Sequence, residues 1–93
     1  MTERGLVSVV VIFLDAERFL EEAVGSVLAQ TFDHWELLLV DDGSTDGSTA
    51  IARRYARTHP GRIRYLEHDG HRTLGMSASR NLGLFHGRGH YIA

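Results

Sequence analysis

The sequence contains no cysteine and no lysine, so all ten basic residues are arginines. The lack of cysteine excludes disulfides, thiolate metal sites and thiol nucleophiles, and the lack of lysine excludes mechanisms that need a lysine amine. No apolar run approaches the roughly 20 residues that cross a bilayer, and the acid within residues 1–4 is unlike a signal peptide. We therefore expect a cytoplasmic location, with peripheral membrane association open for the complete protein.

Apolar residues recur at strand or helix periods along most of the 93 residues, which make one domain. Leu6–Leu14 is rich in β-branched residues and indicates a central strand, and Asp15 suits the cap of a helix at 16–30. The other expected elements are strands at 35–40, 62–67 and 90–93, helices at 47–58 and 76–86, and polar connections at 31–34 and 68–75. This order predicts an α/β fold of three layers, in which a mostly parallel sheet of about four strands has helices on both faces.

The spacing of apolar residues predicts the buried side of each helix. In the first helix these residues are Phe19, Leu20, Ala23, Val24, Val27 and Leu28. In the second they are Ile51, Ala52, Tyr55 and Ala56, with a solvated face of Arg53, Arg54 and Arg57. In the third they are Ala78, Leu82 and Phe85.

The most informative stretch is the apolar strand that runs into Asp41, Asp42, Gly43 and Ser44. Parallel sheets bind ligands at the carboxyl ends of their strands, which is where these acids lie. The Asp42 carboxylate can accept a hydrogen bond from the ring N–H of a nucleobase, while Gly43 permits a sharp turn and Ser44 can help cap the next helix. The alternative is an ordinary strand-to-helix turn in which the acids accept only backbone hydrogen bonds.

Several other motifs are absent or incomplete. No dinucleotide fingerprint or Walker loop is present, and a calcium loop starting at Asp42 would place Arg53 where a glutamate is required. The histidine pairs at 68 and 71 and at 86 and 90 lack a convincing third zinc ligand, and we expect these side chains to be solvated. Arg80 follows a glycine-containing loop, where an arginine could reach a phosphate.

Five segments, in this order, closely resemble the N-terminal half of glycosyltransferase family 2, which has the Rossmann-like GT-A fold. They are 7–11, 19–32, 35–48, 77–84 and 89–93. The resemblance covers almost the whole chain, and it implies an inverting enzyme that transfers sugar from a nucleotide-diphospho-sugar, most often a UDP-sugar, to an acceptor hydroxyl. It also implies a divalent cation, Mg or Mn, that bridges the diphosphate. The acceptor, saccharide or lipid-linked, is unknown, and no nucleic-acid partner is expected.

The resemblance also assigns roles to individual residues. Asp42 is expected to recognise the uracil ring, with support from Asp41 and the Gly43–Ser44 turn, while the segment around Arg80 lies near the nucleotide. The end of the first strand, which comprises Ile12, Phe13, Leu14 and Asp15, lines the base pocket. Because the family's usual aromatic is missing from these four residues, Phe13 or Leu14 must supply the apolar contact. The resemblance places the metal-binding D-x-D element and the catalytic base beyond residue 93, so we expect the chain to be a truncated domain with no catalytic residue or metal ligand of its own.

Two alternatives remain. One is another doubly wound phosphate-handling enzyme; a receiver domain would need a lysine, and an aspartate-nucleophile phosphatase would need D-x-D rather than adjacent aspartates. The other is a non-catalytic remnant of the same fold that associates with itself through the truncated sheet.

Overall fold

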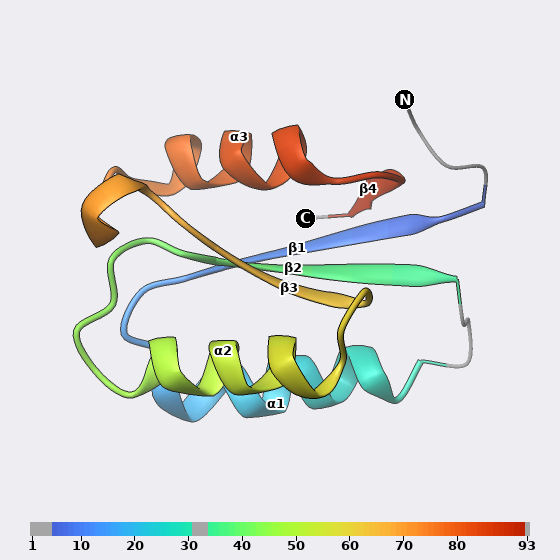
Figure 1. Cartoon of the computed structure of the whole chain (residues 1–93), viewed down its shortest axis with the longest axis horizontal. Coiled ribbons are helices and arrows are strands. Elements are labelled where there is room, and N and C mark those ends of the chain that lie inside the picture. The colour runs from blue at the N-terminus through green and yellow to red at the C-terminus, as the bar shows by residue number, and fades with distance from the viewer. Residues whose placement is uncertain (1–4, 31–33, 93) are drawn as a thin grey trace.

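A computed structural model describes residues 5–30 and 34–92 of the chain (Figure 1). In chain order the elements are β1 (Val7–Phe13), α1 (Glu17–Leu28), β2 (Trp35–Asp41), α2 (Ser48–Thr58), β3 (Ile63–Glu67), the 3-10 helix η1 (Asp69–His71), α3 (Met76–His86) and β4 (His90–Ile92). Every expected strand and helix is present, and η1 lies in a segment expected to be a loop. Most of the connection expected at 31–34, and Ala93 of the last strand, lie outside the described residues.

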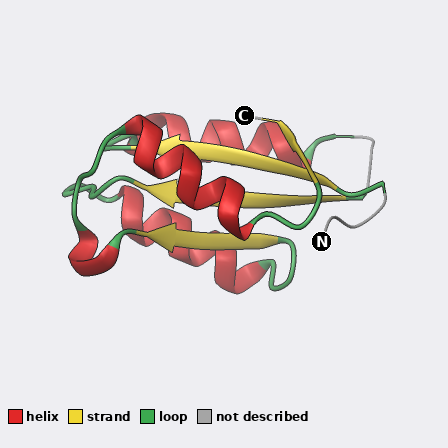
Figure 2. Ribbon diagram, turned by 90° about the horizontal axis from the view of Figure 1, so that it is seen from above, coloured by secondary structure: helices red, strands yellow, loops and turns green. Residues whose placement is uncertain are grey.

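The four strands form one parallel sheet in the order β3-β2-β1-β4. Helices α1 and α2 cover one face and α3 covers the other (Figure 1). The α/β three-layer prediction is therefore confirmed. The long strand arrows all point to the same end of the molecule, where the loops after β1, β2 and β3 gather (Figure 2).

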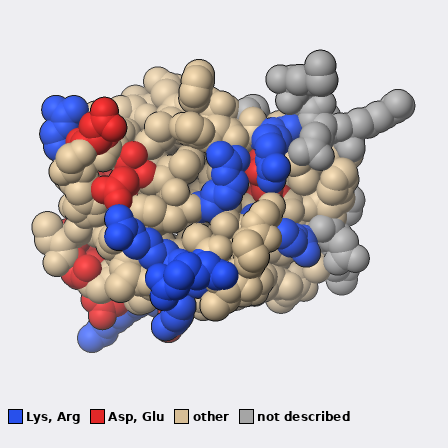
Figure 3. Space-filling view, viewed as in Figure 1, with Lys and Arg blue, Asp and Glu red and all other residues tan. Residues whose placement is uncertain are grey.

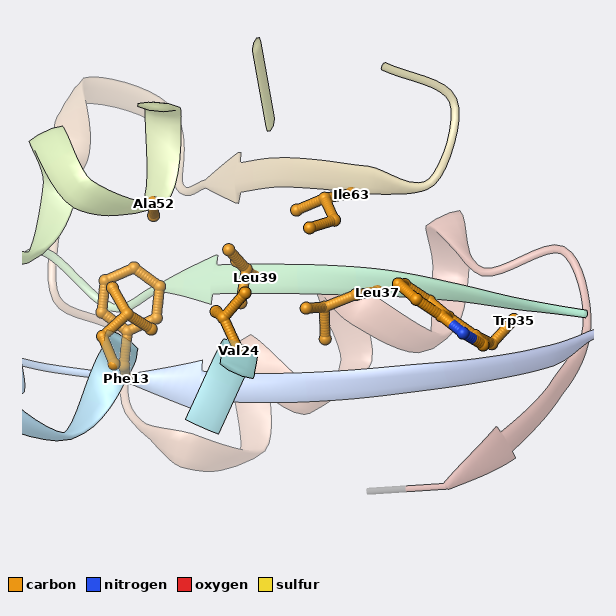
Figure 4. Close-up of a cluster of buried hydrophobic side chains, with 8 residues drawn as sticks. Phe13, Val24, Trp35, Leu37, Leu39, Ala52 and Ile63 are labelled. Carbon is orange, nitrogen blue, oxygen red and sulfur yellow. The ribbon is translucent and has the colours of Figure 1, made fainter. Parts of the chain in front are cut away.

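Strand β2 is buried along its whole length because both of its faces are covered. Its odd-numbered apolar residues pack toward α1 and α2 in the larger core cluster (Figure 4). That cluster consists of Phe13, Leu20, Val24, Trp35, Leu37, Leu39, Ala52 and Ile63. Its even-numbered residues Leu38 and Val40 pack with Val10, Leu82 and their neighbours in a second cluster. The alternation of side chains along a strand explains this division.

The predicted buried face of α2 is confirmed, whereas those of α1 and α3 were partly wrong. Phe19 in α1 is 73% exposed and Phe85 in α3 is 83% exposed. The buried residues of α3 are instead the small Ser79 and Gly83. A Cβ atom on Gly83 would lie 2.6 Å from a methyl carbon of Val10, so only glycine allows α3 to pack this closely on the sheet.

None of the helices in the described segments is long and apolar enough to cross a membrane.

Candidate functional site

The loops that follow β1, β2 and β3 meet at the carboxyl edge of the sheet (Figure 2). The pairing of β1 with β2 continues into this edge, because the backbone N–H of Asp42 donates to the carbonyl of Phe13 at 2.9 Å. Side-chain hydrogen bonds then join the loop after β2 to the loop after β1 on one side and to the loop after β3 on the other. The predicted site residues on the first two strands are therefore brought together.

Asp41 is fully buried and holds the second loop to its surroundings. Its carboxylate accepts hydrogen bonds from the backbone N–H of Ser44 at 2.8 Å, the hydroxyl of Thr49 at 2.5 Å and the hydroxyl of Tyr65 at 2.8 Å. Burial acts to raise the pKa of Asp41, but hydrogen bonds from Thr49 and Ser44 outweigh it and lower the pKa. Burial and the bond to Asp41 raise the pKa of Tyr65. Asp41 is thus an ionised structural anchor of the loop after β2.

Asp15 does not cap α1, contrary to the sequence prediction. The N-cap of α1 is Ala16, which has no side chain able to cap. Asp15 instead has a positive φ of 49°, and its carboxylate accepts hydrogen bonds from the backbone N–H groups of Thr45 at 2.7 Å and Asp46 at 3.3 Å. The prediction failed because the nearest backbone donors to Asp15 belong to the next loop rather than to its own helix.

A carboxylate at the amino end of each of α1 and α2 accepts a hydrogen bond from the backbone at the amino end of the other helix. Glu17, at the start of α1, accepts a hydrogen bond from the N–H of Gly47 at 2.8 Å. Asp46, before α2, accepts from the N–H of Ser48 at 2.8 Å and from that of Glu17 at 3.4 Å. These carboxylates occupy the helix ends that would otherwise attract an anion.

Asp42 lies at the centre of the edge and is only 3% exposed. Its Oδ1 accepts from the N–H of Leu74 at 2.8 Å and from that of Gly75 at 3.1 Å, and its Oδ2 accepts from Gly75 at 3.2 Å. The Nε2 atom of His68 lies 3.6 Å from Oδ1. The third loop therefore covers the carboxylate that the family resemblance assigns to the base.

The prediction that His68 and His71 are solvated is wrong. The His68 ring is buried, and its Nε2 lies 2.9 Å from the hydroxyl of Ser79. In His71, Nε2 lies 2.7 Å from the carbonyl oxygen of Ser44 and Nδ1 lies 2.7 Å from the Glu67 carboxylate. Because both of these partners are acceptors, they suit the doubly protonated ring and raise the pKa of His71, the Ser44 carbonyl most strongly. The two histidines brace the third loop rather than form a metal site.

The end of β1 divides its side chains between the core and the surface. Ile12 packs against the second core cluster, and Phe13 lies within the first with 4% exposure. Leu14 is 47% exposed. Of the two residues that could supply an apolar contact to a base, only Leu14 presents an accessible side chain. Arg80 is exposed on α3, one turn after the third loop.

The surface of this edge carries charges of both signs. Figure 3 shows most of the aspartate and glutamate side chains of this face toward the end with the three loops, with arginines beside them and across the middle of the face. A shallow cavity of about 340 Å³ is lined here by Asp15, Ala16, Glu17, Arg18, Phe19 and Asp46. Within 5–30 and 34–92, no group of three or more histidine, aspartate or glutamate side chains could hold a metal ion. The described residues therefore do not fit a divalent cation by themselves.

A second buried carboxylate, Glu36, lies near the opposite end of β2 and is 1% exposed. It accepts hydrogen bonds from the hydroxyl of Ser8 and the backbone N–H of Arg88, both at 2.6 Å, and from Nε of Arg88 at 3.1 Å. Arg64 lies 3.6 Å away. Burial acts to raise the pKa of Glu36, but hydrogen bonds from Ser8 and Arg88 outweigh it and lower the pKa. The sequence analysis missed this network, although an acid inside an apolar strand is a signal for one.

Comparison with known proteins identifies the family, because residues 8–93 match the model described as Glycosyl transferase family 2. The chain belongs to glycosyl transferase family 2. It is 41% identical over 87 residues to EpsE of Bacillus subtilis (strain 168), which covers 94% of this chain and 31% of EpsE. It is 34% identical over 86 residues to the cholesterol galactosyltransferase of Borreliella burgdorferi, which covers 92% of this chain and 23% of that protein.

Among solved structures, this family 2 chain resembles the mannosyltransferase PcManGT from Pyrobaculum calidifontis, whose structure is a complex with GDP-Man and Mn2+. The TM-score is 0.75 at 28% identity, over 87% of this chain and 24% of the mannosyltransferase. The predicted family and its GT-A, Rossmann-like fold are confirmed. The chain spans about a third or less of the length of these relatives.

Proposed function

We propose that this chain supplies the base-binding part of the donor site of an inverting glycosyltransferase. The donor is a nucleotide-diphospho-sugar, with UDP-sugar as the first candidate, and the Asp42 carboxylate accepts the ring N–H of the base. The observation that carries the proposal is the position of Asp42, which follows β2 at the carboxyl edge and whose partners among the described residues are two backbone N–H groups and a histidine ring. A carboxylate held mainly by neutral backbone donors can exchange them for another neutral donor.

Neighbouring groups complete the proposed site. Asp41 fixes the turn through Gly43 and Ser44, and Leu14 offers an apolar surface beside it. Arg80, exposed at the start of α3, can approach the phosphates. We assign no catalytic base and no metal ligand among the described residues.

A divalent cation forms part of this proposal because three carboxylates line the cavity at this edge. Asp15, Glu17 and Asp46 would repel a diphosphate unless a cation lay between them. The Mn2+ in the structure of the related mannosyltransferase supports the same expectation. The protein ligands of this divalent cation in the complete enzyme would come from outside the described residues. A cytoplasmic location, and self-association through the sheet edge, also remain predictions.

The test is calorimetric titration of the 93-residue chain with UDP, alongside GDP to identify the preferred base. We expect weak UDP binding that falls at least about tenfold in Asp42→Ala, since the lost hydrogen bond is to a charged acceptor. Glu22→Ala, which removes an exposed acid from α1, is the matched control. Equal UDP affinity in the wild type and Asp42→Ala would contradict the role of Asp42, and tighter binding of GDP would correct the choice of base.

A further inference from the structure

The segment Arg72–Gly75, here named the strap, lies directly on the turn that follows β2. A Cβ atom added to Gly43 would lie 2.9 Å from the backbone nitrogen of Thr73 and 3.0 Å from the carbonyl carbon of Arg72. Gly43 also has a φ of 88°, which favours glycine. The close approach of the two backbones therefore depends on the absence of a side chain at this position.

The strap donates hydrogen bonds to the Asp42 carboxylate, which is the group that the proposed function assigns to the base. The N–H groups of Leu74 and Gly75 make three contacts of 2.8 to 3.2 Å with the two Asp42 oxygens. At 3% exposure, Asp42 cannot be reached by the edge of a base while these contacts last. The strap and the base therefore compete for one acceptor.

The strap is tied at both of its ends. At its amino end, His71 joins the carbonyl of Ser44 to the carboxylate of Glu67, at 2.7 Å each, which links the second loop to the end of β3. At its carboxyl end, Gly75 has a φ of 96° and leads into α3. Movement of the strap away from Asp42 thus requires the His71 contacts to weaken or the backbone between His71 and Gly75 to rearrange.

We propose that the strap is a gate of the donor site and that His71 is its latch. The base binds after the N–H groups of Leu74 and Gly75 have left Asp42, so the latch lowers the apparent affinity for the donor by reducing the population of open molecules. This inference depends on the proposed function. His71 acts through the strap and touches neither the base nor the reacting atoms, so it is a positioning residue.

The test combines hydrogen exchange of single amides with UDP titration. In the wild type, saturation with UDP should accelerate exchange at the Leu74 and Gly75 amides, because those groups lose their acceptor. His71→Asn shortens the latch but retains a residue type that tolerates the positive φ of 58° at this position. We expect this variant to exchange faster at both amides without UDP and to bind UDP about three- to tenfold more tightly. The matched control is His59→Asn. His59 is the C-cap of α2, at the opposite end of that helix from the Ser44 loop that His71 contacts, so this change should alter neither readout.

The two proposals fail in different ways. If UDP binds through Asp42 while the Leu74 and Gly75 amides exchange no faster than in the free protein, the gate is wrong and the proposed function stands. Unchanged UDP affinity in His71→Asn overturns the latch. If neither the wild type nor His71→Asn binds UDP or GDP, the proposed function and the gate both fall. The exchange experiment on the wild type needs no variant, so a poorly folded His71→Asn would leave the gate testable.

Discussion

One buried carboxylate, Glu36, lies near the start of β2 and another, Asp42, lies just beyond its end, and the two differ in their partners. Glu36 is surrounded by a hydroxyl, a backbone N–H and two arginine side chains. Asp42, just beyond the strand, accepts hydrogen bonds from two backbone N–H groups of a loop and lies 3.6 Å from a histidine nitrogen. Their exposures are nearly equal, at 1% and 3%. Burial therefore does not distinguish Glu36 from Asp42, whereas the presence of arginine partners does.

The difference has a physical basis. A buried charge with cationic partners is strongly held, because removal of one partner leaves another charge without compensation in the interior. A buried carboxylate with backbone donors can release them when another donor arrives, at a smaller cost. The Glu36 end of the sheet is consequently fixed, and the Asp42 end is suited to exchange.

The largest expected effect comes from Glu36→Gln. This change leaves Arg88 and Arg64 without their buried anion, and we expect the free energy of unfolding to fall by about 3 kcal/mol in urea denaturation. The matched control is Glu21→Gln, which breaks an ion pair with Arg54 whose side chains are 54% and 50% exposed. That control should cost less than about 1 kcal/mol. A similar small cost for both variants would remove the contrast between the two ends of β2.

A smaller loss of stability is expected for Asp42→Asn. The amide keeps the size of the side chain and one acceptor for the Leu74 or Gly75 N–H, but it loses the charge. We expect the free energy of unfolding to fall by about 1 kcal/mol, clearly less than for Glu36→Gln under the same conditions. If Asp42→Asn were the more damaging variant, Asp42 would be the structural acid of the pair.

The smallest effect is a dependence of stability on pH through His71. Its pKa is raised in the folded protein by the Ser44 carbonyl and the Glu67 carboxylate, so its contribution is fully present below its unfolded pKa of about 6.5 and is lost as the pH rises through the folded pKa. Glu67, which also pairs with Arg53, has a lowered pKa and stays ionised in this window. The stability difference between wild type and His71→Asn should therefore shrink as the pH rises past 6.5. A constant or growing difference would show that the ring contributes in its neutral form.

Much of the fold followed from local pattern, because the β-branched runs and the helical stripes agree with the final layers. Two of the failures share one cause, which is contact between segments far apart in the sequence. Phe85 was expected in the core from its helical spacing, but α3 approaches the sheet most closely through Ser79 and Gly83, and Phe85 stays exposed. Asp15 was expected to cap its own helix, but the loop after β2 brings other donors nearer.

The sequence predicted the position of the two acids of the candidate site, but not the loop after β3 that covers Asp42. Asp41 and Asp42 end an apolar strand, and that position alone places them at the carboxyl edge of the sheet. Nothing in the local sequence around Leu74 indicates that its N–H bonds to a carboxylate 32 positions earlier in the chain. The roles of His68 and His71 likewise depend on the path of the chain after β3, which periodicity does not determine.

The reciprocal hydrogen bonds between the starts of α1 and α2 restrict how the loops before these helices can move. Since Glu17 holds Gly47 while Asp15 holds Thr45, the loops after β1 and β2 are fastened together and must shift as one body. If a planar ring enters as proposed, we therefore expect the opening to come from displacement of the strap, on the other side of Asp42.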